Sequence, residues 1–323
     1  MTDHAIPQAD LVGSLPNSPV ASVVSDRLMQ KRFRNTQETL IEWLLFSAAA
    51  ISVLTTLGIV YVLVSESVAF FSTVSLWSFL TDTVWSPLFS NPRYGIMPLL
   101  AGTLTTSLVA LCVAIPLGTI IAIYLAEFAS HKVRETVKPI LELLGGIPTI
   151  VYGHFALIVM TPFLQKFFPN LPGFSMLSAG VVMGIAIIPY ISSLAEDAMS
   201  AVPMSMREGS YGLGATRFQT AIRVVFPAAL SGILSAYILG ISRAVGETMI
   251  VAVAAGGQPN LTMNPMDPAQ TISAYIVQVA LGDLPHGSVA YQSIFAAGLS
   301  LMLMTLFFNI LGHMLRRRFR QAY

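Results

Sequence analysis

Charged residues and cysteine are both scarce in this chain of 323 residues. Only 10% of the residues are Asp, Glu, Lys or Arg, whereas 54% are hydrophobic, and the mean hydropathy is +0.72. Because so few charges could not cover a soluble globule of this length, the composition indicates a membrane protein. The single cysteine, Cys112, excludes a disulfide framework and a cysteine-based metal cluster within one copy.

The sequence also lacks the short motifs of several enzyme classes. It contains no H-E-x-x-H, no G-x-S-x-G and no P-loop pattern, and no cluster of carboxylates with two-metal spacing. Intramembrane hydrolysis is therefore disfavoured, and the chain is not expected to hydrolyse ATP itself. A secondary transporter would be expected to show inverted repeats and midplane carboxylates, and neither is visible. Both classes stay as less favoured alternatives.

Six segments without Asp, Glu, Lys or Arg are each long enough to hold a membrane span. A helix needs roughly 20 apolar residues to cross a hydrocarbon core of about 30 Å. The sequence thus predicts an all-α polytopic protein with six transmembrane helices, the fifth of which continues to about Ala255. The six segments are 43–65, 94–126, 143–165, 167–195, 224–242 and 284–315.

The basic residues predict the orientation of these spans. Segments that are rich in Lys and Arg alternate along the chain with segments that have few. The segments that are rich in basic residues usually face the cytoplasm. Only Arg93 and Lys166 fall on the opposite side, and Arg243 lies within a span. Both termini are therefore expected to be cytoplasmic, and no basic patch indicates nucleic acid. The cytoplasmic set is Arg27, Lys31, Arg32, Arg34, Lys132, Arg134, Lys138, Arg207, Arg217, Arg223, Arg316, Arg317, Arg318 and Arg320.

The segments outside the spans complete the predicted organisation. Residues 1–40 are expected to form a disordered cytoplasmic tail, 41–315 a transmembrane domain, and 316–323 a basic cytoplasmic tail. The first span is too long for a signal-peptide core and is interpreted as an uncleaved anchor. The outer loop 66–93 is rich in aromatic residues, which favours an interfacial aromatic belt over a contact surface for a partner.

A polar segment lies between the fourth and fifth predicted spans, at residues 200–226. Ser205 to Glu208 and Thr216 to Gln219 both have the spacing of a helix capping box. The pattern predicts two short helices that are joined at Gly214, where glycine allows a positive φ, with Pro227 beginning the next element.

This pair of short helices is expected to present apolar side chains on one side. A groove on a soluble partner would contact Tyr211, Leu213 and Phe218. A DNA-reading helix-turn-helix is disfavoured, because the segment carries only three arginines and is confined between two spans.

Two charged residues fall within the predicted fifth span. Arg243 and Glu247 are four residues apart and would share one face of a continuous helix. An arginine at the centre of a membrane costs about 2.5–3.5 kcal/mol on insertion scales, so it should face the bundle interior or an aqueous path. The pair could fix helix packing, or it could form a site on an anion path, where the planar guanidinium suits phosphate.

Carboxylates at the predicted ends of spans two and three have a simpler interpretation. Glu127 and Glu142 are expected to be end charges that extend to the membrane surface. His154 is interpreted as a core histidine.

Several of these motifs together resemble a known family. The similarity covers about residues 40–315, and its most specific part is the run S-R-A-V-G-E-T-M at 242–249. On these residues the chain resembles the PstC-type permease subunit of bacterial phosphate ABC importers. The other matching stretches are L-L-G-G-I-P-T-I-V-Y-G at 143–153, I-P-Y at 188–190 and E-G-S-Y at 208–211.

The resemblance implies an inner-membrane subunit of an ATP-driven phosphate importer with a type I ABC permease fold. Glu208, Gly214 and Pro227 match the loop that couples such permeases to their ATPase, although Gly209 and Ser210 stand where that family usually has two alanines. Arg243 and Glu247 would then lie on the phosphate path.

The resemblance also implies the other components of the importer. The expected partners are a second, PstA-like permease subunit, two PstB-like ATP-binding subunits, a PstS-like phosphate-binding protein outside the membrane, and the lipid bilayer. No cofactor is expected on this chain, since ATP and Mg would be used by the partner ATPase. The sister permease subunit, or a permease for sulfate or molybdate, is the alternative.

The predicted topology can be tested directly. A reporter fused after Arg320 should be cytoplasmic, whereas a cysteine placed at Gly257 in a Cys112→Ala background should react with an impermeant thiol reagent from outside. The reason is that four arginines follow the last span, while no Lys or Arg lies between residues 256 and 291. Cytoplasmic location of both sites would contradict the six-span prediction.

Overall fold

Helices form nearly all the regular structure in the part of the chain that the computed structural model describes, residues 19–282, 284–285 and 287–318. The chain divides into two compact units, Met1–Val62 and Leu63–Tyr323, and each is described by itself. The helices, with η for π-helix, are α1 (Pro19–Thr73), α2 (Leu76–Thr81), α3 (Met97–Ile123), η1 (Tyr124–Phe128), α4 (His131–Gly145), α5 (Thr149–Phe155), η2 (Ala156–Met160), α6 (Thr161–Gln165), α7 (Met176–Ser200), α8 (Met204–Gly212), α9 (Arg217–Thr220), η3 (Ala221–Val225), α10 (Phe226–Ala228), α11 (Leu230–Val245), α12 (Met249–Ala254), α13 (Ile272–Ala280) and α14 (Val289–Arg318).

The first unit consists of the greater part of α1. This helix begins at Pro19, inside the segment that we expected to form a tail, and residues 1–18 lie outside the described residues. Its apolar stretch Glu38–Thr73 is long enough to cross a membrane and contains the predicted first span. The large apolar side chains between Leu40 and Val62 are exposed. A surface of this kind suits contact with lipid or with another membrane subunit.

The second unit is built around the packing of α3 against α7. Glycines on α7 allow this close approach: a Cβ at Gly184 would lie 2.7 Å from the backbone oxygen of Ala110, and one at Gly180 would lie 2.7 Å from the Cβ of Val109. On α3, a Cβ at Gly118 would lie 2.9 Å from Ile191. Small residues at helix contacts are typical of membrane bundles, where close packing replaces the hydrophobic effect.

Four helices are long and apolar enough to span a membrane as single elements, and two bent pairs add two more candidates. The pairs are His131–Gly145 with Thr149–Gln165, bent by 88°, and Arg217–Ala228 with Leu230–Val245, bent by 73°. Six candidate spans result when each pair counts as one. The all-α fold that the sequence predicts is therefore confirmed among the described residues.

The predicted fifth span differs from the structure at both ends. Pro227 does not begin a new element, because the helix continues through it to Ala228 and turns at Ala229. At the other end α11 stops at Val245, and α12 begins only at Met249. The prediction of one continuous helix to about Ala255 is wrong, since the chain breaks at residues 246–248.

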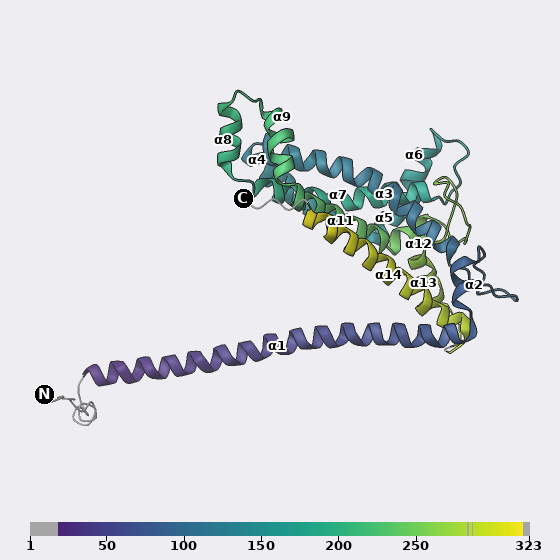
Figure 1. The fold of residues 1–323 in the computed structure, drawn as a ribbon, viewed down its shortest axis with the longest axis horizontal. Helices are drawn as coiled ribbons and strands as arrows, with labels where there is room; N and C mark the ends of the chain where they lie inside the picture. Colours follow the sequence, from purple (N-terminus) through teal and green to yellow (C-terminus); the bar gives the residue numbers. More distant parts are fainter. Residues whose placement is uncertain (1–18, 283, 286, 319–323) are drawn as a thin grey trace. The chain divides into compact units, whose positions relative to one another are not determined.

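Short elements lie at opposite ends of the second unit. Figure 1 shows α8 and α9 at one end, near the start of α4, and α2 and α6 at the other. At the α2 end, Phe70, Phe79 and Trp85 are buried with Tyr275, and the rings of Trp85 and Tyr275 meet edge to face at 4.9 Å. Burial raises the pKa of Tyr275.

The predicted aromatic belt is therefore wrong for the buried rings of the outer loop. The loop folds back on itself through the hydrogen bond from the backbone N–H of Ile96 to the oxygen of Phe79, and its rings pack into a core. Trp77 and Phe89 are exposed, so the aromatic belt stays a prediction for these two residues.

Glycine at the contact between α3 and α7 gives a stability prediction. Gly184→Ala should lower the melting temperature of the purified protein, because overpacking of a tight helix contact typically costs about 1–3 kcal/mol. Gly58→Ala is the matched control, since its Cβ would meet nothing within 4 Å. Equal melting temperatures for the two variants, measured in the same detergent, would contradict this packing.

Candidate functional site

Helices α8 and α9 form a compact pair at one end of the second unit. α8 ends at Gly212, and the chain turns at Gly214, whose φ is +85°. The backbone N–H of Gly214 donates to the oxygen of Tyr211 at 2.9 Å, and that of Ala215 donates to the oxygen of Ser210 at 3.2 Å. A side chain with a Cβ would strain this turn, so the sequence prediction of a glycine junction is confirmed.

One of the two predicted capping boxes is present. Thr216 accepts the N–H of Gln219, and the Gln219 side chain accepts the N–H of Thr216. The box predicted from Ser205 to Glu208 is wrong, because Pro203 precedes the first residue of α8 and no side chain caps that helix. Glu208 is thus an exposed residue within α8, not a helix cap.

The pair exposes the side chains that the sequence led us to expect. Leu213 is 92% exposed and Phe218 65%, and Tyr211 is also exposed. These apolar residues lie on both sides of the turn at Gly214, and Glu208 is an exposed residue of α8. Pro227 is exposed as well but lies in α10, ten residues beyond the start of α9. Glu208 and Gly214 therefore belong to the pair of short helices, whereas Pro227 lies near the end of the helical stretch Arg217–Ala228 that follows the turn.

A buried ion pair fixes the base of α8. Nη2 of Arg207 donates to Oε1 of Glu127 at 2.9 Å and to the backbone oxygen of Met199 at 2.8 Å. The side chains of Arg207 and Glu127 are only 9% and 4% exposed. The expectation that Glu127 extends to the membrane surface is wrong, because Arg207 of α8 pairs with it and both side chains are buried. Opposite charges in two distant segments are visible in the sequence, but no spacing rule pairs them.

A second buried carboxylate joins α4 to α7. Glu196 is completely buried and accepts from the guanidinium of Arg134 and from Nζ of Lys138, the latter at 2.9 Å. Lys138 also pairs with Asp197 at 2.6 Å. Sequence reasoning missed this network, since Glu196 stands just past a predicted span with no motif around it. The network ties the first half of a bent span to the helix that leads into α8.

In the described part of the chain, Arg243 and Glu247 contact other groups and form no ion pair with each other. The guanidinium carbon of Arg243 lies 3.9 Å from the centre of the Tyr190 ring. Oε1 of Glu247 accepts the backbone N–H groups of Met249 at 3.0 Å and Ile250 at 3.3 Å. The two residues do not share one helix face, because α11 ends between them and the carboxylate caps α12 instead of reaching back to the arginine.

The ring beneath Arg243 is connected to the bend between α4 and α5. The hydroxyl of Tyr190 donates to the backbone oxygen of Gly145 at 2.7 Å, and the hydroxyl of Tyr152 donates to that of Leu144 at 2.8 Å. Both acceptors are at the end of α4, whose last carbonyls lack helical partners. Arg243 therefore sits on a tyrosine that holds a broken span in place.

The electrostatics of this cluster leave the charge of Arg243 uncompensated. Within residues 19–282, 284–285 and 287–318, no carboxylate forms an ion pair with Arg243. A ring face attracts a cation without neutralising it, and the attraction leaves the edge N–H groups of the guanidinium able to donate. The described residues also contain no group of three or more His, Cys, Asp or Glu placed to hold a metal ion.

The buried ion pair at the base of α8 gives a prediction. Arg207→Met and Glu127→Gln should each destabilise the protein, because removal of one partner of a buried pair typically costs about 3–5 kcal/mol. The double variant should recover part of the loss, since no charge is then left buried alone. The loss of stability is measured by the melting temperature and by protease cleavage between α8 and α9. A loss in the double variant equal to the sum of the two single losses would refute the pairing.

Comparisons with known proteins agree with this architecture. The family described as "Binding-protein-dependent transport system inner membrane component" matches residues 114–321. The chain is 38% identical over 245 residues to the probable ABC transporter permease protein YqgH of Bacillus subtilis, covering 76% of this chain and 79% of the relative. It is 36% identical over 294 residues to the phosphate transport system permease protein PstC of Mesorhizobium japonicum, covering 84% and 88%.

Solved structures support the same fold. A bacterial alginate ABC transporter, solved in complex with an alginate pentasaccharide-bound periplasmic protein, matches with a TM-score of 0.62 and 19% identity, covering 87% of this chain and 96% of that one. The MetNI methionine ABC transporter matches with a TM-score of 0.51 and 20% identity, covering 70% and 95%. At these identities the likeness concerns the fold, which is that of an ABC importer permease. From its sequence relatives, the chain belongs to the family of binding-protein-dependent transport system inner membrane components, among which the PstC permeases are its relatives.

Proposed function

We propose that this chain is the PstC-type permease subunit of an ATP-driven importer of inorganic phosphate, and forms half of the translocation path. Relatives whose names include phosphate transport are 31–36% identical over most of the chain, which supports the substrate. The observation that carries the proposal is Arg243, an arginine in the helical bundle that stacks on Tyr190 and forms no ion pair with any carboxylate among the described residues.

Arg243 would bind phosphate through the edge of its guanidinium group. The planar fork of N–H donors can contact two phosphate oxygens at once, which a lysine cannot do. Because Tyr190 covers one face of the group, the donor edge is held in a fixed direction. The anion would thus meet a preorganised donor, and no ion pair would have to break first.

Glu247 would act on the same path in a different way. Its carboxylate holds the start of α12, and its own backbone oxygen accepts the hydroxyl of Ser273 at 2.7 Å. These contacts keep the break at residues 246–248 open beside Arg243. A carboxylate four residues from the arginine would also weaken the hold on a dianion, which favours passage over storage.

The pair of α8 and α9 would dock on the ATPase. Glu208 and the apolar side chains around Gly214 are exposed and would contact the partner, which would carry ATP and Mg. Movement of α8 would reach the bundle through the Arg207–Glu127 pair, which joins it to the end of η1. The bend that follows Pro227 would carry the same movement into α11, on which Arg243 lies.

The proposed assembly follows from the family. A binding-protein-dependent permease requires a substrate-binding protein, and one matching transporter was solved with its periplasmic protein. We propose a second permease subunit of the PstA type, two PstB-like ATP-binding subunits and a PstS-like protein outside the membrane. Both termini and the α8–α9 surface would face the cytoplasm, as the basic residues indicate.

Substitution of Arg243 tests this function. In proteoliposomes that contain the whole complex, Arg243→Gln should lower phosphate uptake about 10- to 100-fold, because a hydrogen bond to a charged group contributes about 1.5–3 kcal/mol. Arg243→Lys should recover little of it, since the fork is lost. Uptake is normalised to the amount of assembled complex, and sulfate uptake by the unmodified complex serves as the control for the anion.

The double variant Arg243→Gln/Glu247→Gln separates the transport role from a structural one. We expect it to remain defective, because the two side chains do not neutralise each other. Near-normal phosphate uptake by the double variant would overturn the role on the path. Sulfate uptake equal to that of phosphate would overturn the substrate.

A further inference from the structure

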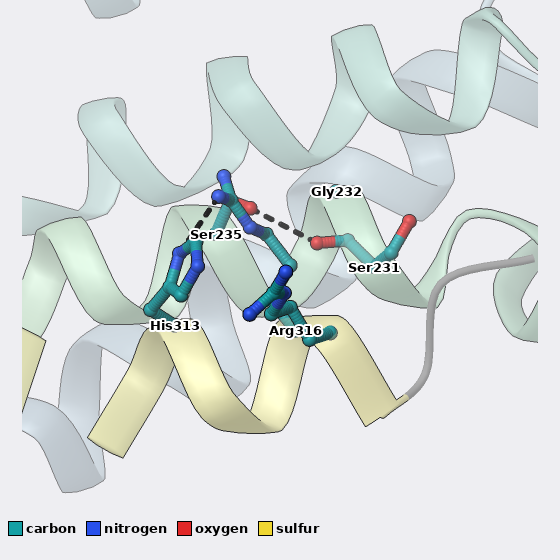
Figure 2. Close-up of a pocket in the computed structure, with 6 residues that line it drawn as sticks. Ser231, Gly232, Ser235, His313 and Arg316 are labelled. Atoms are coloured by element: carbon teal, nitrogen blue, oxygen red, sulfur yellow. Dashed lines mark hydrogen bonds between the residues drawn. The ribbon is translucent and has the colours of Figure 1, made fainter. Parts of the chain in front are cut away.

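A pocket lies between α11 and α14, at the end of α14 that carries three consecutive arginines. Its volume is about 540 Å³, and Figure 2 shows the residues that line it on both helices. The lining contains two hydroxyl groups and three side chains with nitrogen donors, and no carboxylate. The lining residues are Ser231, Gly232 and Ser235 from α11 and His313, Arg316 and Arg317 from α14.

Two glycines allow α11 to pack closely against its neighbours beside the pocket. A Cβ at Gly312 would lie 2.3 Å from Cγ1 of Ile238, so α14 and α11 touch closely at that level. Gly232 faces α7, where a Cβ would lie 2.5 Å from that of Ala198. Beyond the contact at Gly312, the hollow is lined by Ser231 and Ser235 on the side of α11.

The exposed Arg316 and Arg317 of this pocket differ from the arginines that join helices within the bundle. Arg134 and Arg207 each pair with a carboxylate, Glu196 and Glu127 respectively. In the described part of the chain, neither Arg316 nor Arg317 forms an ion pair with a carboxylate; Nη2 of Arg316 lies 3.0 Å from Nδ1 of His313. The hydroxyl of Ser235 already donates to the backbone oxygen of Ser231 at 3.0 Å, so the two arginines and the hydroxyl of Ser231 are the groups that would hold an anion with several acceptor oxygens.

The pocket continues along the two helices into an apolar groove. An adjoining hollow of about 240 Å³ shares Ser235, His313 and Arg316 and adds Ile238, Leu239 and Asn309. Leu239 is exposed, as are Ile310 and Leu311 on α14. The site is therefore basic at the end of the span and apolar further into it. A free inorganic anion would use only the first part, whereas a phospholipid has a charged phosphate joined to hydrocarbon and would use both.

We propose that this pocket binds an anionic phospholipid, with the headgroup phosphate on Arg316 and Arg317 and an acyl chain along Leu239. Basic pockets between transmembrane helices on the cytoplasmic side suit anionic headgroups, and each Lys or Arg near such a surface contributes on the order of 1 kcal/mol. The lipid would hold α14 against α11, the helix that carries Arg243. The proposal is independent of the transported substrate.

The test measures lipid retention by the full-length protein in its native assembly. The purified complex is titrated with phosphatidylglycerol or phosphatidylcholine of identical acyl chains, and bound lipids are counted by native mass spectrometry. We expect at least about tenfold preferential retention of phosphatidylglycerol, and loss of that preference in Arg316→Gln/Arg317→Gln. The matched control Arg318→Gln/Lys132→Gln removes the same charge from exposed residues outside the pocket and should keep the preference.

A second variant tests the space without changing the charge. Ser235→Phe should fill the pocket and reduce phosphatidylglycerol retention as much as the loss of both arginines does. An equal loss in the control double variant would overturn the proposal, because general electrostatic attraction would then explain the binding. Displacement of the lipid by inorganic phosphate would show that the pocket is a site for a free anion and would overturn the proposal. The proposal would also be overturned if the variants lost a protein subunit and not a lipid, because the pocket would then be a protein contact.

Discussion

The arrangement of the end of the second unit that carries α8 and α9 depends on the need to neutralise two carboxylates that are buried near it. Glu127 and Glu196 are almost inaccessible, so each requires a cation from another element. Glu127 takes Arg207 from α8, and Glu196 takes Arg134 and Lys138 from α4. Because a buried charge without a partner costs several kcal/mol, these contacts restrict where α4 and α8 can lie. The exposed surface around Gly214 is thereby connected to the bundle through the ion pair at the start of α8.

Broken helices give the inner part of the bundle its polar groups. A continuous helix satisfies its own backbone, so residues 246–248 and the end of α4 expose donors and acceptors that need other partners. The carboxylate of Glu247 accepts backbone N–H groups at the start of α12. The hydroxyls of Tyr190 and Tyr152 donate to backbone oxygens at the end of α4. Tyr190 also bears Arg243 on its ring. One side chain thus links the break in one span with the arginine of another, which makes the cluster responsive to any movement of the bend.

Local features of this protein could be predicted from sequence, and contacts between distant segments could not. The turn at Gly214 and the capping box at Thr216 depend on a few neighbouring residues, and both were predicted correctly. The spans were also predicted in number, since composition decides them when each bent pair counts as one. The break after Val245 escaped prediction, because the spacing of Arg243 and Glu247 also fits one continuous helix, and the partners that stabilise the break come from α13 and from the start of α12. Pairing of Glu127 with Arg207 spans 80 positions, and no spacing rule reaches that far.

The surroundings of each arginine, more than its position in the chain, indicate what it does. Arg134 and Arg207 each form an ion pair with a carboxylate from another helix. Their charge is neutralised, and each pair joins two helices. Arg243 has an aromatic ring, which orients the group but leaves its charge to act on something else. Arg316 and Arg317 line a hollow together with two serines and a histidine, so the hollow offers both positive charge and space for a ligand. Since a charge in or near a membrane is stabilised where something balances it, the two proposed roles differ in one respect: an anion that passes would balance Arg243, whereas an anion that stays would balance Arg316 and Arg317.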